Sequence, residues 1–206
     1  MLDRLFAKID EWRTASREVR GVPVVVRNTR PDIDTGAVFA RLDAALALIE
    51  RYQPHHFRRL RRDFAQILVV RYPCRGAWLP EQRTCLVELT FSVNPEFSDA
   101  QVAATILHEA MHARLDRMGL SYEGVSRARH ERFCRRAELE FGQLVPDGEP
   151  VVARALQSLA ESDEAVAPVV DWELASHRVN EADLAALDAP RWLKRVVARR
   201  RGLEEA

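Results

Sequence analysis

Apolar residues recur at helical spacing along much of the chain. The pattern predicts an amphipathic helix over 2–20 and a second over 34–52, which Asp34 or Thr35 can cap. Further helices are expected over 54–65, 99–117, 122–143 and 151–162, with shorter ones near 171–177, 181–188 and 190–201. Helices therefore account for most of the expected structure.

Three short apolar runs, rich in β-branched residues, interrupt this helical pattern. They lie at 22–26, 67–72 and 84–91, and they predict strands. Pro73, Gly76 and Pro80 predict a loop between the last two of them. The expected fold class is α+β, mostly helical, with a small antiparallel or mixed sheet.

The helix expected over 99–117 carries the sequence His108-Glu109-Ala110-Met111-His112. Residues four apart lie on the same face of a helix, so both imidazoles can address one metal ion. Glu109 lies beside that face, where it is better placed to act on a water than to bind the metal. The motif therefore indicates two ligands of a Zn²⁺ ion and a general base.

A third ligand is needed, because a catalytic zinc has three protein ligands and one position open to water. Glu131 follows His112 after eighteen residues, on the helix expected over 122–143, and His130 is its rival. Neighbouring helical residues point about 100° apart, so only one of the two should reach the metal. Cys134, one turn further on, can approach the site or simply be buried.

The motif, the eighteen-residue interval and Glu131 together resemble the gluzincin pattern of zinc peptidases, over about 98–143. The resemblance implies a zincin-like fold, with a small sheet packed on an active-site helix and a second helix that carries the Glu ligand. It implies that His108, His112 and Glu131 bind zinc and that Glu109 is the general base. It also assigns the strand at 84–91 to the edge of the sheet that binds substrate.

One position departs from this pattern. Thermolysin-like enzymes carry an acidic residue four positions after the Glu ligand, where it supports a zinc histidine, but this chain has Arg135 there. Glu138 or Asp116 can take that supporting role instead. Tyr122 and His177 are candidate donors for stabilising the oxyanion, although residues of these types in such positions are more often ordinary surface or packing residues.

The amino-acid composition excludes few classes of function. Lys plus Arg and Asp plus Glu both total 31, so the net charge gives no argument for a nucleic-acid partner. The start of the chain lacks the pattern of a secretory signal, and no apolar run approaches the ~20 residues of a membrane span. We therefore expect a cytoplasmic protein without a membrane partner. The expected organisation is a zincin-like catalytic domain over 1–146 and a helical extension, packed on it, over 147–206.

Two classes of function follow. The first is a zinc-dependent hydrolase, specifically a metallopeptidase with a peptide or protein substrate. The alternative is a non-catalytic or regulatory zinc-binding protein that contacts protein or nucleic acid through its basic C-terminal helix over 191–201. Glu109 favours the first class, because a purely structural site has no need of a general base. The sequence indicates neither substrate specificity nor oligomeric state.

Overall fold

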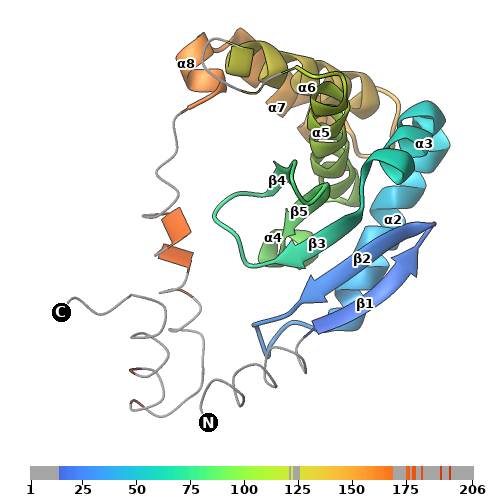
Figure 1. The fold of residues 1–206 in the computed structure, drawn as a ribbon, viewed down its shortest axis with the longest axis vertical. Helices are drawn as coiled ribbons and strands as arrows, with labels where there is room; N and C mark the ends of the chain where they lie inside the picture. The colour runs from blue at the N-terminus through green and yellow to red at the C-terminus, as the bar shows by residue number, and fades with distance from the viewer. Residues whose placement is uncertain are drawn as a thin grey trace.

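The computed structural model describes residues 14–120, 122 and 126–168, together with a few isolated positions between 175 and 195. Within these residues the protein is α+β and mostly helical, with one small mixed sheet (Figure 1). The strands are β1 (Thr14–Val19), β2 (Val22–Arg27), β3 (Gln66–Val70), β4 (Gly76–Leu79) and β5 (Thr84–Glu88). The helices are α2 (Thr35–Tyr52), α3 (Pro54–Asp63), α4 (Leu89–Val93), α5 (Asp99–Arg117), α6 (Ser126–Gly142), α7 (Glu149–Ala160) and α8 (Asp163–Val166).

The five strands lie in the order β1-β2-β3-β5-β4. The pairs β2–β3 and β3–β5 are parallel, whereas the two outer pairs, β1–β2 and β4–β5, are antiparallel. All five residues of β5 are buried, as expected for an interior strand covered on both faces. The short strand β4 forms one edge of the sheet.

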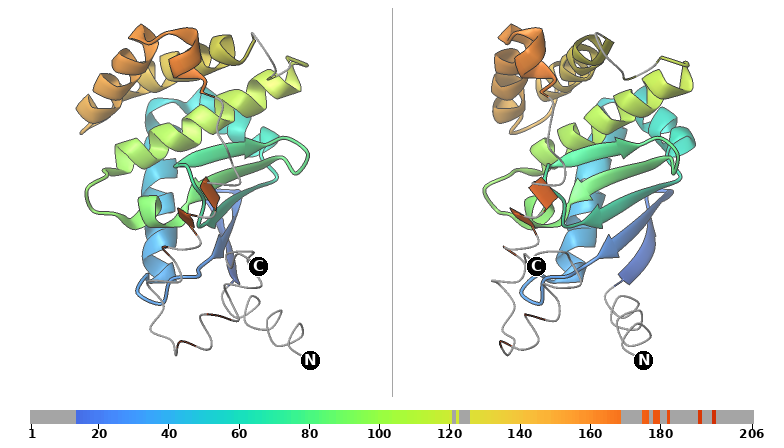
Figure 2. Two further views of the ribbon diagram at one scale, coloured as in Figure 1. Left: turned by 90° about the vertical axis from the view of Figure 1, so that its left-hand side faces the viewer. Right: turned by 60° about the vertical axis from the view of Figure 1, so that its left-hand side comes forward.

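Helix α5 is the central helix of the fold. It packs against α2, α3, β4 and β5 on one side and against α6 on the other. Figure 2 shows α5 lying between the sheet and the layer formed by α6, α7 and α8. Fully buried apolar side chains join the sheet to the helices, among them Val24, Val26, Leu42, Leu46, Ile67, Val69, Ile106 and Leu107. This core fixes the position of α5 and therefore of its two histidines.

The prediction of a helix over 2–20 is wrong for the residues that the structure describes. Thr14–Val19 is the strand β1, which pairs with β2. Arg20 and Gly21 both have positive φ, 51° and 75°, and form a two-residue hairpin turn between Val19 and Val22. Backbone twist in such a turn matches that of the flanking strands, so the pairing overrides the helical pattern. The rest of the predicted helix, 2–13, lies outside the described residues.

The strand predicted over 84–91 ends earlier, and it is not the edge of the sheet. Strand β5 stops at Glu88, whose carboxylate accepts a hydrogen bond from the Phe91 N–H at 2.6 Å and caps α4. The edge strand is β4, in the segment that was predicted to be a loop. Gly76 in this strand and the prolines on either side of it are typical of a loop, so the pattern did not indicate a strand of only four residues.

The other predicted elements are confirmed where the structure describes them. These are the strands near 22–26 and 67–72 and the helices near 34–52, 54–65, 99–117, 122–143 and 151–162, with bounds that shift by a few residues. The helices predicted beyond residue 170 lie outside the described residues, apart from isolated positions. Helix α7 packs on α6, while the division into 1–146 and 147–206 stays a prediction. No helix in the described part of the chain is long and apolar enough to cross a bilayer.

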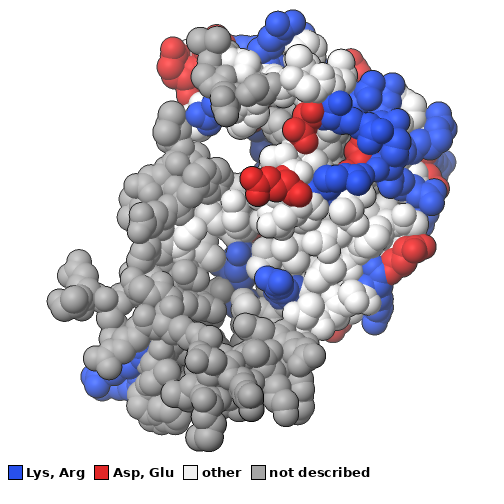
Figure 3. All heavy atoms as spheres, viewed as in Figure 1, with Lys and Arg blue, Asp and Glu red and all other residues white. Residues whose placement is uncertain are grey.

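A cluster of arginines covers the exposed face of α3. Arg58, Arg59, Arg61 and Arg62 are all exposed, and Figure 3 shows Lys and Arg side chains gathered on this side of the molecule. The buried Phe57 and Leu60 on the opposite face hold the helix on the core. The arrangement is that of an amphipathic surface helix with a solvated basic face.

Glu88, at the end of β5, is bonded both to α4 and to Arg71 just after β3, and should contribute strongly to stability. Its buried carboxylate pairs with Arg71, accepts from the Thr90 hydroxyl at 2.7 Å and caps α4. We expect Glu88→Ala to lower the free energy of unfolding by about 3 kcal/mol, because it leaves a half-buried guanidinium without that carboxylate. Urea unfolding measures the change, with the exposed Glu81→Ala as control. Equal stability of the two variants would contradict the prediction.

Candidate metal centre

The first part of the site is a pair of histidines on α5. Ser98 and Gln101 form a reciprocal capping box that fixes where the helix begins. Ten residues on, His108 and then His112 project from the same face, and their Nε2 atoms lie 3.1 Å apart. His108 is buried, with 6% of its surface exposed, and His112 is half-buried. Two ring nitrogens this close to each other can be satisfied by a shared proton or by a metal ion that binds both.

Glu131 comes to this pair from α6. One of its carboxylate oxygens lies 3.2 Å from Nε2 of His108, and the other lies 3.3 Å from Nε2 of His112. The Tyr122 hydroxyl donates a hydrogen bond to the same carboxylate at 2.5 Å. Burial would raise the pKa of Glu131, but its hydrogen bonds with the two histidines hold it well below its ordinary value. Glu131 is therefore a carboxylate, which is the form that binds metals.

These spacings fit a single metal ion. Ligand atoms about 2.1 Å from a tetrahedral ion lie about 3.4 Å from one another. The two Nε2 atoms are 3.1 Å apart, and each faces a different oxygen of Glu131 at 3.2 or 3.3 Å, so all three separations are close to that value although they involve both carboxylate oxygens. Two imidazoles and one carboxylate are also a donor set that zinc accepts.

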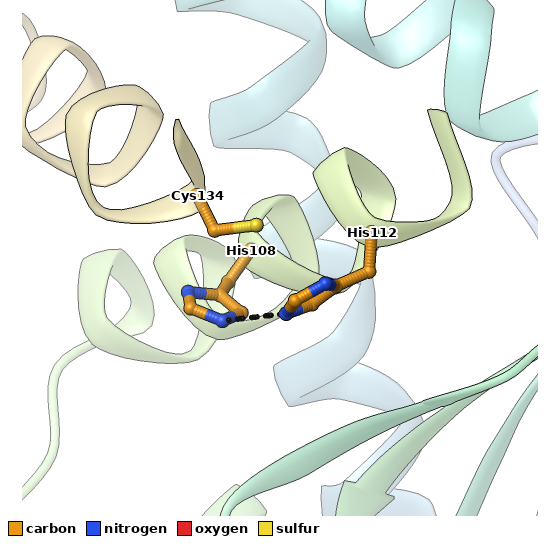
Figure 4. A group of neighbouring side chains, drawn as sticks. All are labelled: His108, His112 and Cys134. Atoms are coloured by element: carbon orange, nitrogen blue, oxygen red, sulfur yellow. Dashed lines mark hydrogen bonds between the residues drawn. The ribbon is translucent and has the colours of Figure 1, made fainter. Parts of the chain in front are cut away.

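Cys134 is a further potential ligand. Its thiol and ligand atoms of His108 and His112 all lie within 4.8 Å of one another, so this buried group could hold a metal ion. In the view of Figure 4 the sulfur lies towards the backbone of α5, whereas the facing Nε2 atoms lie at the far ends of the rings. Burial first, and the nearby carboxylates second, raise the pKa of this thiol well above its ordinary value. The thiol is therefore protonated in this arrangement.

His130, the rival third ligand, lies elsewhere in the site. Its ring is 5.8 Å from that of Tyr122, and within the described residues it makes no hydrogen bond with either motif histidine. Glu131, its neighbour along α6, contacts both. The arrangement agrees with the expectation that only one residue of this pair can face α5.

Glu138 orients His108. Its Oε1 lies 2.6 Å from Nδ1 of His108, leaving Nε2 free to face His112, and Arg135 holds the same carboxylate from 2.8 Å. Asp116, the other candidate for this role, instead accepts a weak hydrogen bond from the Trp78 indole at 3.4 Å. A supporting carboxylate of this kind fixes the tautomer and orientation of a metal-binding imidazole.

The buried carboxylates make this site attractive to a cation. Burial would lower the pKa of His108, but the charge of Glu138 and hydrogen bonds with Glu131 and Glu138 raise it to about 10. Burial would raise the pKa of Glu138, whereas the charge of His108 and its hydrogen bond lower it to about 2. Both shifts have one cause, since buried negative charge requires positive charge beside it.

Glu109 lies beside this donor set and takes no part in it. It is 5% exposed, and burial raises its pKa above the ordinary value. A Cβ added at Gly76 in β4 would come within 3.0 Å of its Oε1 and 2.7 Å of the Thr105 methyl. The glycine therefore lets the edge strand approach the carboxylate closely.

The two motif histidines, Glu131 and Glu138 line one cleft of about 1000 Å³, whereas Cys134 is not part of its lining. Gly76 to Leu79 of β4 form part of its wall, and Val166 to Pro168, which include the end of α8, form another part. The buried carboxylate of Glu109 thus lines the same cleft as the candidate ligands and a sheet edge.

Of the two candidate oxyanion donors, only Tyr122 can be placed. Its side chain lies in the cleft, 42% exposed, with its ring edge-on to His112 at 5.0 Å and its hydroxyl bonded to Glu131. His177 lies outside the described residues. The structure thus gives Tyr122 a contact with a candidate ligand, a role that spacing alone did not indicate.

Comparisons with protein-family models, with curated protein sequences and with solved structures found no match to this chain.

Proposed function

We propose that this protein is a zinc-dependent hydrolase that cleaves peptide bonds. The observation that carries the proposal is the convergence of two Nε2 atoms and the Glu131 carboxylate within 3.1 to 3.3 Å, with Glu109 beside them in a cleft. His108, His112 and Glu131 are the proposed ligands, and Glu138 orients His108 through Nδ1. The three ligand side chains also line the cleft, from which a water or substrate could reach a metal ion that they held.

Each residue then has a distinct part in the reaction. A bound Zn²⁺ supplies a Lewis acid that polarises the scissile carbonyl and makes water a better nucleophile at neutral pH. Glu109 accepts the proton of the attacking water and delivers it to the leaving nitrogen. Its burial supports this role, because a raised pKa brings the carboxylate closer to the working pH of a general base. The Tyr122 hydroxyl donates its one proton to Glu131, so it would have to leave that carboxylate in order to donate to a developing oxyanion.

The edge strand β4 supports a peptide as substrate. Within the described residues β4 pairs only with β5, and it lines the cleft beside Glu109. An exposed sheet edge offers backbone N–H and C=O groups that an extended peptide can pair with. A peptide bound in this way would present successive carbonyls to the metal position.

The alternative is a non-catalytic zinc-binding protein. Buried Cys134 favours it to the extent that a site with two His, one Glu and one Cys would have no position left for water. The buried Glu109 argues against it, because a closed site gives this carboxylate no reaction to serve. The two functions differ in whether chelator-sensitive cleavage accompanies the metal.

The experiment is to measure the metal content of the full-length protein and then its cleavage of a random peptide library. We expect one zinc per chain and cleavage that stops with chelator and returns with added zinc. Stoichiometric zinc without cleavage of any peptide would replace the proposal with the non-catalytic alternative. Absence of zinc binding would overturn both.

Glu138 gives a separate prediction on metal affinity. Glu138→Gln keeps the shape of the side chain but removes the charge that raises the pKa of His108. We expect zinc affinity to fall about 10- to 100-fold, as is usual when the hydrogen-bond partner of a metal histidine is lost. Competition with a zinc chelator measures the change, and Glu140→Gln on the same helix is the control. An unchanged affinity would contradict the orienting role.

A further inference from the structure

Three arginines gather around Glu138 in the cleft. Arg75 immediately precedes β4, Arg135 lies on α6 and Arg154 lies on α7, and all three line the cleft. They come from separate parts of the chain, yet they lie close enough to affect one another. Burial first, and then the charges of Arg135 and Arg75, lower the pKa of Arg154 against the opposing effect of Glu138.

Within the described part of the chain, carboxylate partners are too few for these guanidinium groups. Arg135 binds Glu138 at 2.8 and 3.0 Å, but its buried Nε has no hydrogen-bond partner there. The guanidinium groups of Arg75 and Arg154 make no hydrogen bond or ion pair with a described residue. Arg75 is held instead by its guanidinium lying over the Phe97 ring, 4.4 Å from the centroid. Among the residues that the structure describes, these half-buried guanidinium groups therefore leave donors unpaired where they line the cleft.

The charged residues that line the cleft also favour the binding of an anion. Among the described residues, its lining contains four arginines and four carboxylates. A divalent cation on the two histidines would therefore leave the cleft with net positive charge. Positive groups confined together in a partly buried site repel one another, and an anion entering the cleft would relieve that repulsion.

We propose that Arg75, Arg135 and Arg154 form an anion subsite that binds a carboxylate of the substrate. The inference rests on the proposed function in that the substrate is taken to be a peptide, whose carboxylate is either an acidic side chain or the free C-terminus. The planar guanidinium fork matches a carboxylate with two parallel hydrogen bonds, which gives orientation as well as affinity. The subsite lies beside the proposed ligands, so it would determine which peptide bond reaches Glu109.

Binding to an inactive protein tests the subsite independently of turnover. The protein is the full-length, zinc-loaded Glu109→Gln variant, and the readout is fluorescence polarisation of labelled hexapeptides. Matched peptides carry Glu or Gln at each position in turn with an amidated C-terminus, and a further neutral peptide has a free C-terminal carboxylate. We expect at least one carboxylate peptide to bind about tenfold more tightly than its neutral counterpart. The position of the preference distinguishes a side chain from the C-terminus.

Substitution of the arginines then shows which of them produce the tighter binding of carboxylate peptides. In the same background, Arg154→Gln or Arg75→Gln should abolish the difference between matched peptides, and the exposed Arg136→Gln on α6 should leave it intact. Circular dichroism and zinc content confirm that each variant is folded, and Arg154→Lys keeps the charge if Arg154→Gln does not fold. Equal binding of carboxylate and neutral peptides overturns the subsite, as does a preference that survives both substitutions. Failure of the wild-type protein to cleave any peptide would instead overturn the proposed function and leave this binding result unaffected.

Discussion

Glu109→Gln should abolish turnover without loss of zinc. The amide has nearly the shape of the carboxylate, so the close approach of Gly76 is kept, but it cannot accept the proton of the attacking water. General base catalysis typically contributes 10²–10⁴-fold, and we therefore expect kcat to fall by about three orders of magnitude. Because Glu109 takes no part in the proposed ligand set, zinc affinity should stay within about threefold of that of the wild type.

Peptide cleavage by single-turnover kinetics and zinc content by atomic absorption check this result together. Glu96→Gln, an exposed substitution in the loop before α5, serves as the control for handling and expression. Activity retained in Glu109→Gln would refute the assignment of Glu109 as general base. Loss of zinc from this variant would instead place Glu109 among the ligands and require a different base.

The helices and strands that were predicted correctly are those whose formation depends on residues close to one another in the sequence. Helix α5 is marked by the capping box at Ser98 and by apolar residues at helical spacing, so its place and the direction of His108 and His112 follow from local rules. Strand β1 depends instead on pairing with β2 across a two-residue turn, and its apolar spacing alone resembles a helix. Strand β4 is still shorter, and its pairing with β5 cannot be seen in its four residues.

The same distinction applies to the candidate site. Glu131 was identified from the interval after His112, but nothing decided between Glu138 and Asp116 as the partner of His108. A residue seven positions after Glu131 falls about 20° short of two full turns, so Glu138 shares its face of α6, and helical geometry was a signal that could have favoured it. Arg75 and Arg154 lie on either side of α6 in sequence, and only tertiary packing brings both to the cleft. No local pattern joins them.

The identity of the third ligand should be decided by two substitutions on α6. Glu131→Ala removes the carboxylate that contacts both Nε2 atoms, and we expect zinc affinity to fall about a thousandfold, since a site with two protein ligands holds zinc weakly. Cys134→Ala removes the only other side chain of the described residues that groups with both histidines as a potential ligand. We expect that variant to keep its zinc affinity and its activity.

Chelator competition measures both affinities, and urea unfolding without metal separates a lost ligand from a lost fold. The four outcomes have different meanings. Loss of zinc in Glu131→Ala alone supports the three-ligand site with a position open to water, on which the hydrolase depends. Loss in both variants describes a closed site with four protein ligands, and therefore the non-catalytic alternative. Loss in Cys134→Ala alone would make Glu131 a carboxylate that serves the site only through Tyr122 and the histidines. If both variants retained zinc, the metal would not be bound by α6, and the chemistry proposed for Glu109 would be refuted.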